Sequence, residues 1–190
     1  LSYVFEYYKP LLSWLVRKSS VDLGYGDSYG NTSEGLPFFK NFYAGGPQSV
    51  RGFEANTLGP SYGNCLPVPP ETTCIPSYLQ PLGGAVKVAG SFEFLFPRLF
   101  SKARGTRLSA FVDYGNVYAG SVDYSAYQNP VTGAVFNDDK FTFDSLRVSA
   151  GVALKWQAPV GPISISYAFP FNTTDFDRVE NLQFTFGQKF

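Results

Sequence analysis

Residues 146–156 read Leu-Arg-Val-Ser-Ala-Gly-Val-Ala-Leu-Lys-Trp, and their even and odd positions differ in chemical character. The even positions are all apolar, whereas the odd positions carry Arg, Ser, Gly, Ala and Lys. A period of two places successive side chains on opposite faces of a strand. The stretch therefore predicts a β-strand with one apolar face and one small, polar face.

The same alternation recurs along the chain and predicts an all-β fold. About seven strands are expected, near 1–9, 13–26, 84–97, 106–118, 145–157, 162–170 and 180–190. Their connections are short or moderate at 9–12, 97–106 and 158–162, but longer and polar at 27–83, 118–144 and 171–180. Short turns at one end and long loops at the other are typical of an antiparallel transmembrane β-barrel of the outer-membrane type.

The composition agrees with strands that face lipid. Aromatic residues make up 18% of the chain and charged residues 16%, below the roughly 25% of an average soluble domain. No apolar run approaches the length of a membrane-spanning helix. Fifteen basic and fifteen acidic residues with no basic cluster argue against a nucleic-acid partner. The absence of His removes the commonest metal ligand and general base, so no metal, cofactor or enzyme active site is predicted.

A soluble β-sandwich is the alternative for an alternating pattern. Its outer face would be mostly charged and rich in Thr, whereas the polar face here is small and mixed, as suits a crowded barrel lumen. Aromatic side chains also gather on the apolar face toward strand ends, where interface girdles lie, at Tyr114, Tyr118, Trp156, Tyr167 and Phe169. These features favour the membrane barrel.

Two further features concern processing and compartment. The chain has no Met and begins inside an alternating pattern, which indicates an excised or processed fragment. Cys65 and Cys74 lie close together in a Pro-rich stretch without a neighbouring His. A local disulfide in an oxidising compartment is predicted, and a free reduced pair is the alternative.

The long connection at 27–83 carries a motif of its own. Aromatic residues between 36 and 46 precede Val50-Arg51-Gly52-Phe53. Such a cluster is not expected to stay in water, so the loop is predicted to be ordered and to fold back into the barrel, with its aromatics covered. Glycine permits tight turns there, and the guanidinium of Arg51 offers several donors to acidic partners.

The loop motif and several strand segments together resemble the BamA family, the central subunits of the outer-membrane β-barrel assembly machine. The matching stretches are Phe-Tyr-Ala-Gly-Gly at 42–46, Val-Arg-Gly-Phe at 50–53, Asn-Thr-Leu-Gly-Pro at 56–60, Asp-Tyr-Gly-Asn-Val at 113–117, Ser-Ala-Gly-Val-Ala-Leu at 149–154 and Pro-Val-Gly-Pro-Ile at 159–163. The resemblance covers essentially the whole chain. It implies about seven C-terminal strands of a sixteen-stranded barrel with a long lumenal loop, the N-terminal periplasmic domains being absent.

The resemblance also implies a site. Arg51 of the loop motif is expected to bind acidic side chains on the inner wall, and the matching positions are Glu93 and Asp113. The alternation independently places both carboxylates on the lumenal face of adjacent strands. A solvated loop arginine is the alternative.

The end of the chain carries two further features of the resemblance. Gly187 matches a glycine that lets the last strand kink at a lateral gate, and the alternative is a small residue chosen for space. Leu182, Phe184, Phe186 and Phe190 resemble the terminal signature read by the assembly machinery, and the alternative is an ordinary amphipathic edge strand.

The resemblance implies insertion and assembly of β-barrel proteins in the bacterial outer membrane, through a lateral gate at the seam of the first and last strands. Outer-membrane lipids, unfolded outer-membrane protein clients and the lipoproteins of the machine are the expected partners, the last bound through the absent periplasmic domains. A related barrel for two-partner secretion or autotransporter assembly is the alternative. A passive porin would lack the folded-in loop.

Overall fold

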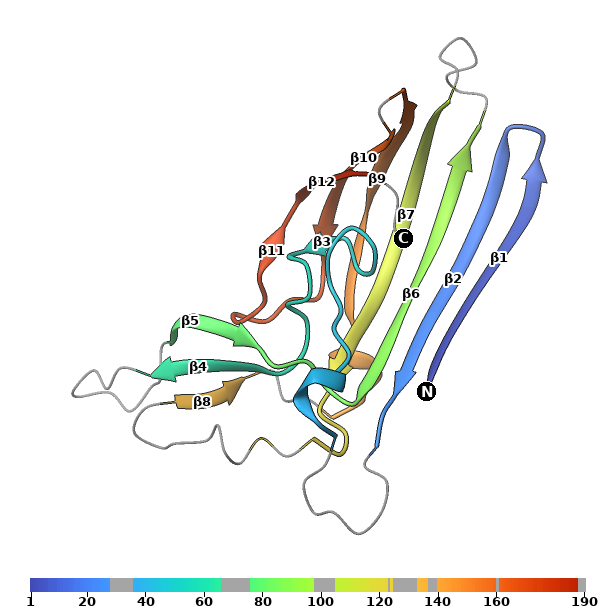
Figure 1. The fold of residues 1–190 in the computed structure, drawn as a ribbon. Helices are drawn as coiled ribbons and strands as arrows, with labels where there is room; N and C mark the ends of the chain where they lie inside the picture. Colours follow the sequence, from blue (N-terminus) through green and yellow to red (C-terminus); the bar gives the residue numbers. More distant parts are fainter. Residues whose placement is uncertain are drawn as a thin grey trace.

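The computed structural model describes residues 1–27, 36–65, 76–97, 105–122, 124, 133–136, 140–159 and 161–187. In these ranges the chain forms a seven-stranded antiparallel sheet in the order β1-β2-β6-β7-β9-β10-β12 (Figure 1). The strands are β1 (Ser2–Leu12), β2 (Leu15–Tyr25), β6 (Val86–Phe96), β7 (Thr106–Tyr118), β9 (Arg147–Ala158), β10 (Gly161–Pro170) and β12 (Leu182–Phe186). The predicted all-β, antiparallel architecture is confirmed.

Neighbouring strands in this sheet follow one another along the chain, as in an up-and-down barrel wall. The strand ends that short connections join lie at the top of Figure 1, and the strand ends that long connections join lie toward the other end of the sheet. No helix in the described ranges has the length and hydropathy needed to cross a membrane.

The two faces of the sheet differ as the period of two requires. On the concave face, Ala89, Glu93, Ser109, Asp113, Ser149 and Gln183 are buried, whereas on the convex face Phe92, Val112, Val152, Tyr167 and Phe184 are exposed. Tyr118 departs from the predicted girdle. It is buried, its ring packs edge-on against Phe141, and its hydroxyl hydrogen-bonds the Ser145 hydroxyl.

The long connections contain strands that the alternation did not predict. A three-stranded sheet in the order β5-β4-β8 combines β4 (Ser61–Cys65) and β5 (Pro76–Pro81) with β8 (Gly133–Phe136) of the 118–144 connection. A two-stranded pair joins β3 (Gly52–Phe53) to β11 (Val179–Glu180). The last strand was expected over 180–190, but Glu180 belongs to β11, and β12 starts at Leu182.

The segment between the short helix η1 (Phe38–Lys40) and β4 lies on the concave face of the sheet (Figure 1). Its apolar residues form the core with the wall, through Ala44, Val50, Phe53 and Leu58 from the loop and Ala89 and Val117 from β6 and β7. The expectation that all the loop aromatics are covered is wrong for Phe39. This side chain is 69% exposed, since η1 lies at the rim of the sheet rather than in its concavity.

Candidate functional site

Arg51 is held in the concavity by a carboxylate on β7. Its Nε and one Nη lie 2.6 and 2.8 Å from the two carboxylate oxygens of Asp113, and its backbone N–H donates to the same carboxylate at 3.1 Å. Asp113 has no exposed side-chain surface. The pair is therefore a bidentate, charge-assisted contact shielded from solvent, which is the strongest form of arginine–carboxylate interaction.

A second carboxylate and two hydroxyls complete the surroundings of Arg51. Glu93 Oε1 lies 3.5 Å from the other Nη and also accepts a hydrogen bond from Ser109 at 2.6 Å. Ser91 stands between the groups, because it accepts from Arg51 at 3.2 Å and donates to Asp113 at 2.5 Å. The structure thus brings Arg51, Glu93 and Asp113 together, with the carboxylates on the neighbouring strands β6 and β7.

The Arg51 guanidinium also stacks on the ring of Phe111, its central carbon 3.4 Å from the ring centroid. Burial alone would lower the pKa of Arg51, but the hydrogen bonds and negative charges of Asp113 and Glu93 outweigh it and raise the pKa. The side chain therefore stays charged, and the buried site holds a cation between two acidic groups.

Gly52 lets the backbone of the loop approach the wall. Its φ is +90°, and a Cβ there would lie 3.1 Å from Ala168 Cβ of β10 and 3.4 Å from Ser149 Cβ of β9. The Ser149 hydroxyl donates to the carbonyl of Arg51. The motif is thus seated by its main chain as well as by Arg51, and Val50 and Phe53 on either side are fully buried.

Gln183 on β12 is the main contact that the sequence did not reveal. Its side-chain nitrogen donates to the carbonyl of Phe53 at 2.6 Å, and its oxygen accepts from the N–H of Gly52 at 3.4 Å. Only its burial and this double contact distinguish it from other polar residues on the lumenal face. The loop motif is therefore bound to the last strand as well as to β7.

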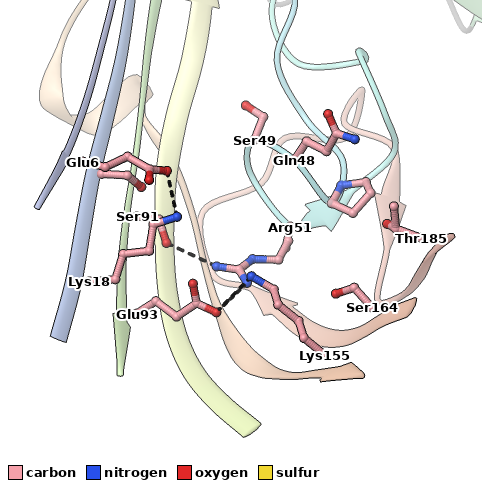
Figure 2. Close-up of a pocket in the computed structure, with 12 residues that line it drawn as sticks. Glu6, Lys18, Gln48, Ser49, Arg51, Ser91, Glu93, Lys155, Ser164 and Thr185 are labelled. Atoms are coloured by element: carbon pink, nitrogen blue, oxygen red, sulfur yellow. Dashed lines mark hydrogen bonds and ion pairs between the residues drawn. The ribbon is translucent and has the colours of Figure 1, made fainter. Parts of the chain in front are cut away.

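A polar cavity of about 430 Å³ lies beside the motif, between the loop and the wall (Figure 2). Lys18 and Glu6 form an ion pair at 2.8 Å on one side, and Lys155 approaches Glu93 at 3.7 Å on the other. Both signs of charge line it. Among the described residues no group of three His, Cys, Asp or Glu is placed to hold a metal ion.

The remaining predicted residues lie at the chain end and in the loop. Leu182, Phe184 and Phe186 are exposed on the convex face, and Gly187 has a φ of +95°. Phe190 and Cys74 lie outside the described residues, so the full terminal signature and the Cys65–Cys74 disulfide stay predictions.

A curved antiparallel sheet with an exposed aromatic face, a polar inner face and a loop seated inside defines a portion of an outer-membrane β-barrel wall. The chain belongs to the Omp85 superfamily, whose domain matches residues 1–190.

Individual relatives within this superfamily are assembly factors. The chain is 39% identical over 182 residues to the outer membrane protein assembly factor BamA of Neisseria meningitidis serogroup B, covering 89% of this chain and 21% of that protein. It is 26% identical over 137 residues to BamA of Nitratidesulfovibrio vulgaris, covering 72% of this chain and 13% of the relative. The chain thus spans about a fifth or less of these curated relatives.

The fold also matches a solved barrel of the same kind. The crystal structure of BamA from Haemophilus ducreyi lacking POTRA domains 1–3 superimposes with a TM-score of 0.72 at 30% identity, over 96% of this chain and 33% of that one. The predicted family resemblance and the outer-membrane location are confirmed.

Proposed function

We propose that this chain forms the last part of the barrel of an assembly factor, and that this factor inserts β-barrel proteins into the outer membrane through a lateral gate at its last strand. The names of the relatives support the general role. The form of β12 supports the gate.

The single observation that supports the gate is that β12 is short and makes few backbone pairs with its neighbour β10. It has 5 residues, whereas the other strands of the sheet have 10 to 13. It pairs with β10 only from Ile163 to Tyr167. A strand with so few backbone pairs would open easily at a barrel seam, and an opened edge offers backbone N–H and C=O groups on which another strand can add.

The geometry of Gly187 supports a bend at the end of this strand. A φ of +95° is one that other residues rarely adopt. Among the described residues, a Cβ at this position would meet no atom within 4 Å, which favours a conformational role over a glycine chosen for space. A bend here would weaken the pairing of the last strand at the seam, as a gate requires.

The mechanism that follows is templating rather than covalent chemistry. A client strand would pair with the free edge, while its apolar side chains enter lipid beside Leu182 and Phe184. The loop motif would support β12 from inside the lumen through Gln183. Unfolded outer-membrane proteins are the proposed clients, the lipoproteins of the machine are the proposed partners of the periplasmic domains, and no enzymatic step or cofactor is required.

The test is insertion of a small barrel client into proteoliposomes that contain the full-length protein and its partners. Gly187→Val should slow insertion at least tenfold. Gly161→Val is the matched control, because Gly161 also has positive φ and open space for a Cβ, but lies at the short β9–β10 turn. It should insert clients at nearly the wild-type rate.

An equal decrease in the insertion rate of the two variants would contradict the gate and would indicate only that both proteins are less stable. Release of a soluble partner across the membrane without client insertion would instead support the secretion alternative.

A further inference from the structure

Lysines on the concave face of the sheet are paired with carboxylates, whereas two cations on the convex face have no such partner among the described residues. Lysines on the concave face of β2, β6 and β9 each lie near a carboxylate, in the pairs Lys18–Glu6 at 2.8 Å, Lys87–Asp22 at 2.6 Å and Lys155–Glu93 at 3.7 Å. Lys9 and Arg17 lie on the convex face, and among the described residues neither has an acidic partner. Their positive charges therefore face the lipid side without a neutralising carboxylate among the described residues.

Lys9 and Arg17 are direct partners across the β1–β2 pair. Side chains in directly opposed positions lie about 5 Å apart at Cβ, and like charges there repel each other. The Nε of Arg17 is buried and has no hydrogen-bond partner among the described residues. The hydroxyl of Ser19, on the same face two residues further along, is also buried and unpartnered. Among the described residues, no acidic side chain therefore balances the two cations at this corner of the sheet.

The position of the two cations along the strands fits a membrane interface. Trp14 lies in the short β1–β2 turn, and Arg17 follows it three residues later in β2. Trp14 is half exposed and stacks on Phe96 with ring centroids 6.3 Å apart. Trp rings mark the headgroup level of a bilayer, and short turns lie on the periplasmic side of outer-membrane barrels. Beyond the cations, Phe92 and Phe94 continue the exposed apolar face.

We propose that Lys9 and Arg17 form a binding site for the phosphate of a phospholipid headgroup at the periplasmic interface. The phosphate would lie between the two cations, where it removes their mutual repulsion and accepts paired hydrogen bonds from the guanidinium. The acyl chains would lie along Phe92 and Phe94. Each basic residue near a membrane surface contributes about a fivefold gain in binding, so the pair contributes about 30-fold.

The probe is spin-labelled phosphatidylglycerol, with its association measured for the full-length protein in detergent micelles. The double variant Lys9→Gln/Arg17→Gln should bind it about 30-fold more weakly than wild type. Lys40→Gln/Lys140→Gln is the matched control, because it removes the same charge from two exposed lysines in the long connections. It should bind like wild type. The heat-dependent gel shift of folded barrels verifies that each variant is folded.

Two further arms separate the sources of phosphate and keep the test valid if the double variant does not fold. Wild-type protein should bind labelled diacylglycerol, which lacks the phosphate, as weakly as the double variant binds the phospholipid. Inorganic phosphate at millimolar concentration should not displace the phospholipid. Equal binding of the two lipids by wild type, equal binding of phospholipid by the double variant and its control, or full displacement by inorganic phosphate would each overturn the proposal.

Discussion

Replacing Arg51 by alanine tests whether the loop is anchored by its contacts to Asp113 and Glu93. In the docked loop, the substitution leaves Asp113 buried, and the donors that remain to it among the described residues are the Ser91 hydroxyl and the backbone N–H of residue 51. Breaking a buried ion pair from one side costs about 3–5 kcal/mol. Since 1.36 kcal/mol corresponds to a factor of ten, the ratio of released to docked loop should rise between about 10² and 10⁴-fold.

Arg51→Lys separates charge from geometry. Lysine keeps the positive charge but loses the two-pronged contact to Asp113 and the stacking on Phe111. Loss of one hydrogen bond to a charged group costs about 1.5–3 kcal/mol, so the released fraction should rise about 10 to 150-fold. Alanine should therefore release the loop more than lysine does.

The assay is limited proteolysis of the full-length protein in detergent with chymotrypsin, whose specificity is independent of residue 51. Glu54→Gln is the control within the same loop. Its ion pair with Arg178 is 3.4 Å long and exposed, so its loss should change cleavage less than about fivefold. If Arg51→Ala is cleaved within fivefold of wild type, or Arg51→Lys is cleaved as fast as Arg51→Ala, the anchoring by the buried pair is refuted.

Three other outcomes follow from the same site. Gln183→Leu should leave the carbonyl of Phe53 and the N–H of Gly52 without a hydrogen-bond partner, which costs about 1–3 kcal/mol for each group. Hydrogen exchange at β12 and Gly52 should become faster, and unchanged exchange would contradict the contact. Gly52→Ala should cost about 1–2 kcal/mol from its φ of +90° alone, and a melting temperature equal to that of wild type would argue against the seating of the motif. Because the pKa of Arg51 is raised in the folded protein, its contribution to the stability of the docked loop is complete below the unfolded pKa and is lost only as the pH rises past the folded pKa. Protection of the loop from proteolysis should therefore be constant from about pH 6 to 9. In Arg51→Lys, protection should instead fall once the pH rises above about 10, where lysine begins to lose its proton, and a wild-type protein that loses protection earlier would contradict the assignment.

The wall of the barrel could be predicted from sequence because its physics is local. Alternation at 146–156 requires only that one face of a strand meets lipid and the other meets a lumen, and the same rule assigned Glu93 and Asp113 to one face. Arg51 was a candidate because it is a lone arginine after an aromatic cluster, and the family resemblance implied its pairing with Glu93 and Asp113.

The parts that sequence reasoning missed depend on long-range contacts. The strands β4, β5 and β8 are short and contain Pro or Gly, so no local period marks them, and β4 pairs with β8 across more than 65 residues. Gln183 is one polar residue in an alternating strand, and only the seated loop shows that its amide binds Gly52 and Phe53. Phe39 was expected to be covered because it is apolar, but apolar character does not predict where η1 lies relative to the sheet.

The double attachment of the loop motif also sets an order of events during folding. Asp113 is 62 residues from Arg51, and Gln183 is 131 residues from Gly52. Contacts between such distant residues form late, because the intervening chain must first be ordered. Until β7 is in place, Arg51 lacks its bidentate partner Asp113, and until β12 is in place, Gly52 and Phe53 lack the amide of Gln183. A fully seated loop therefore requires that the β7 and β12 portions of the wall are both in place.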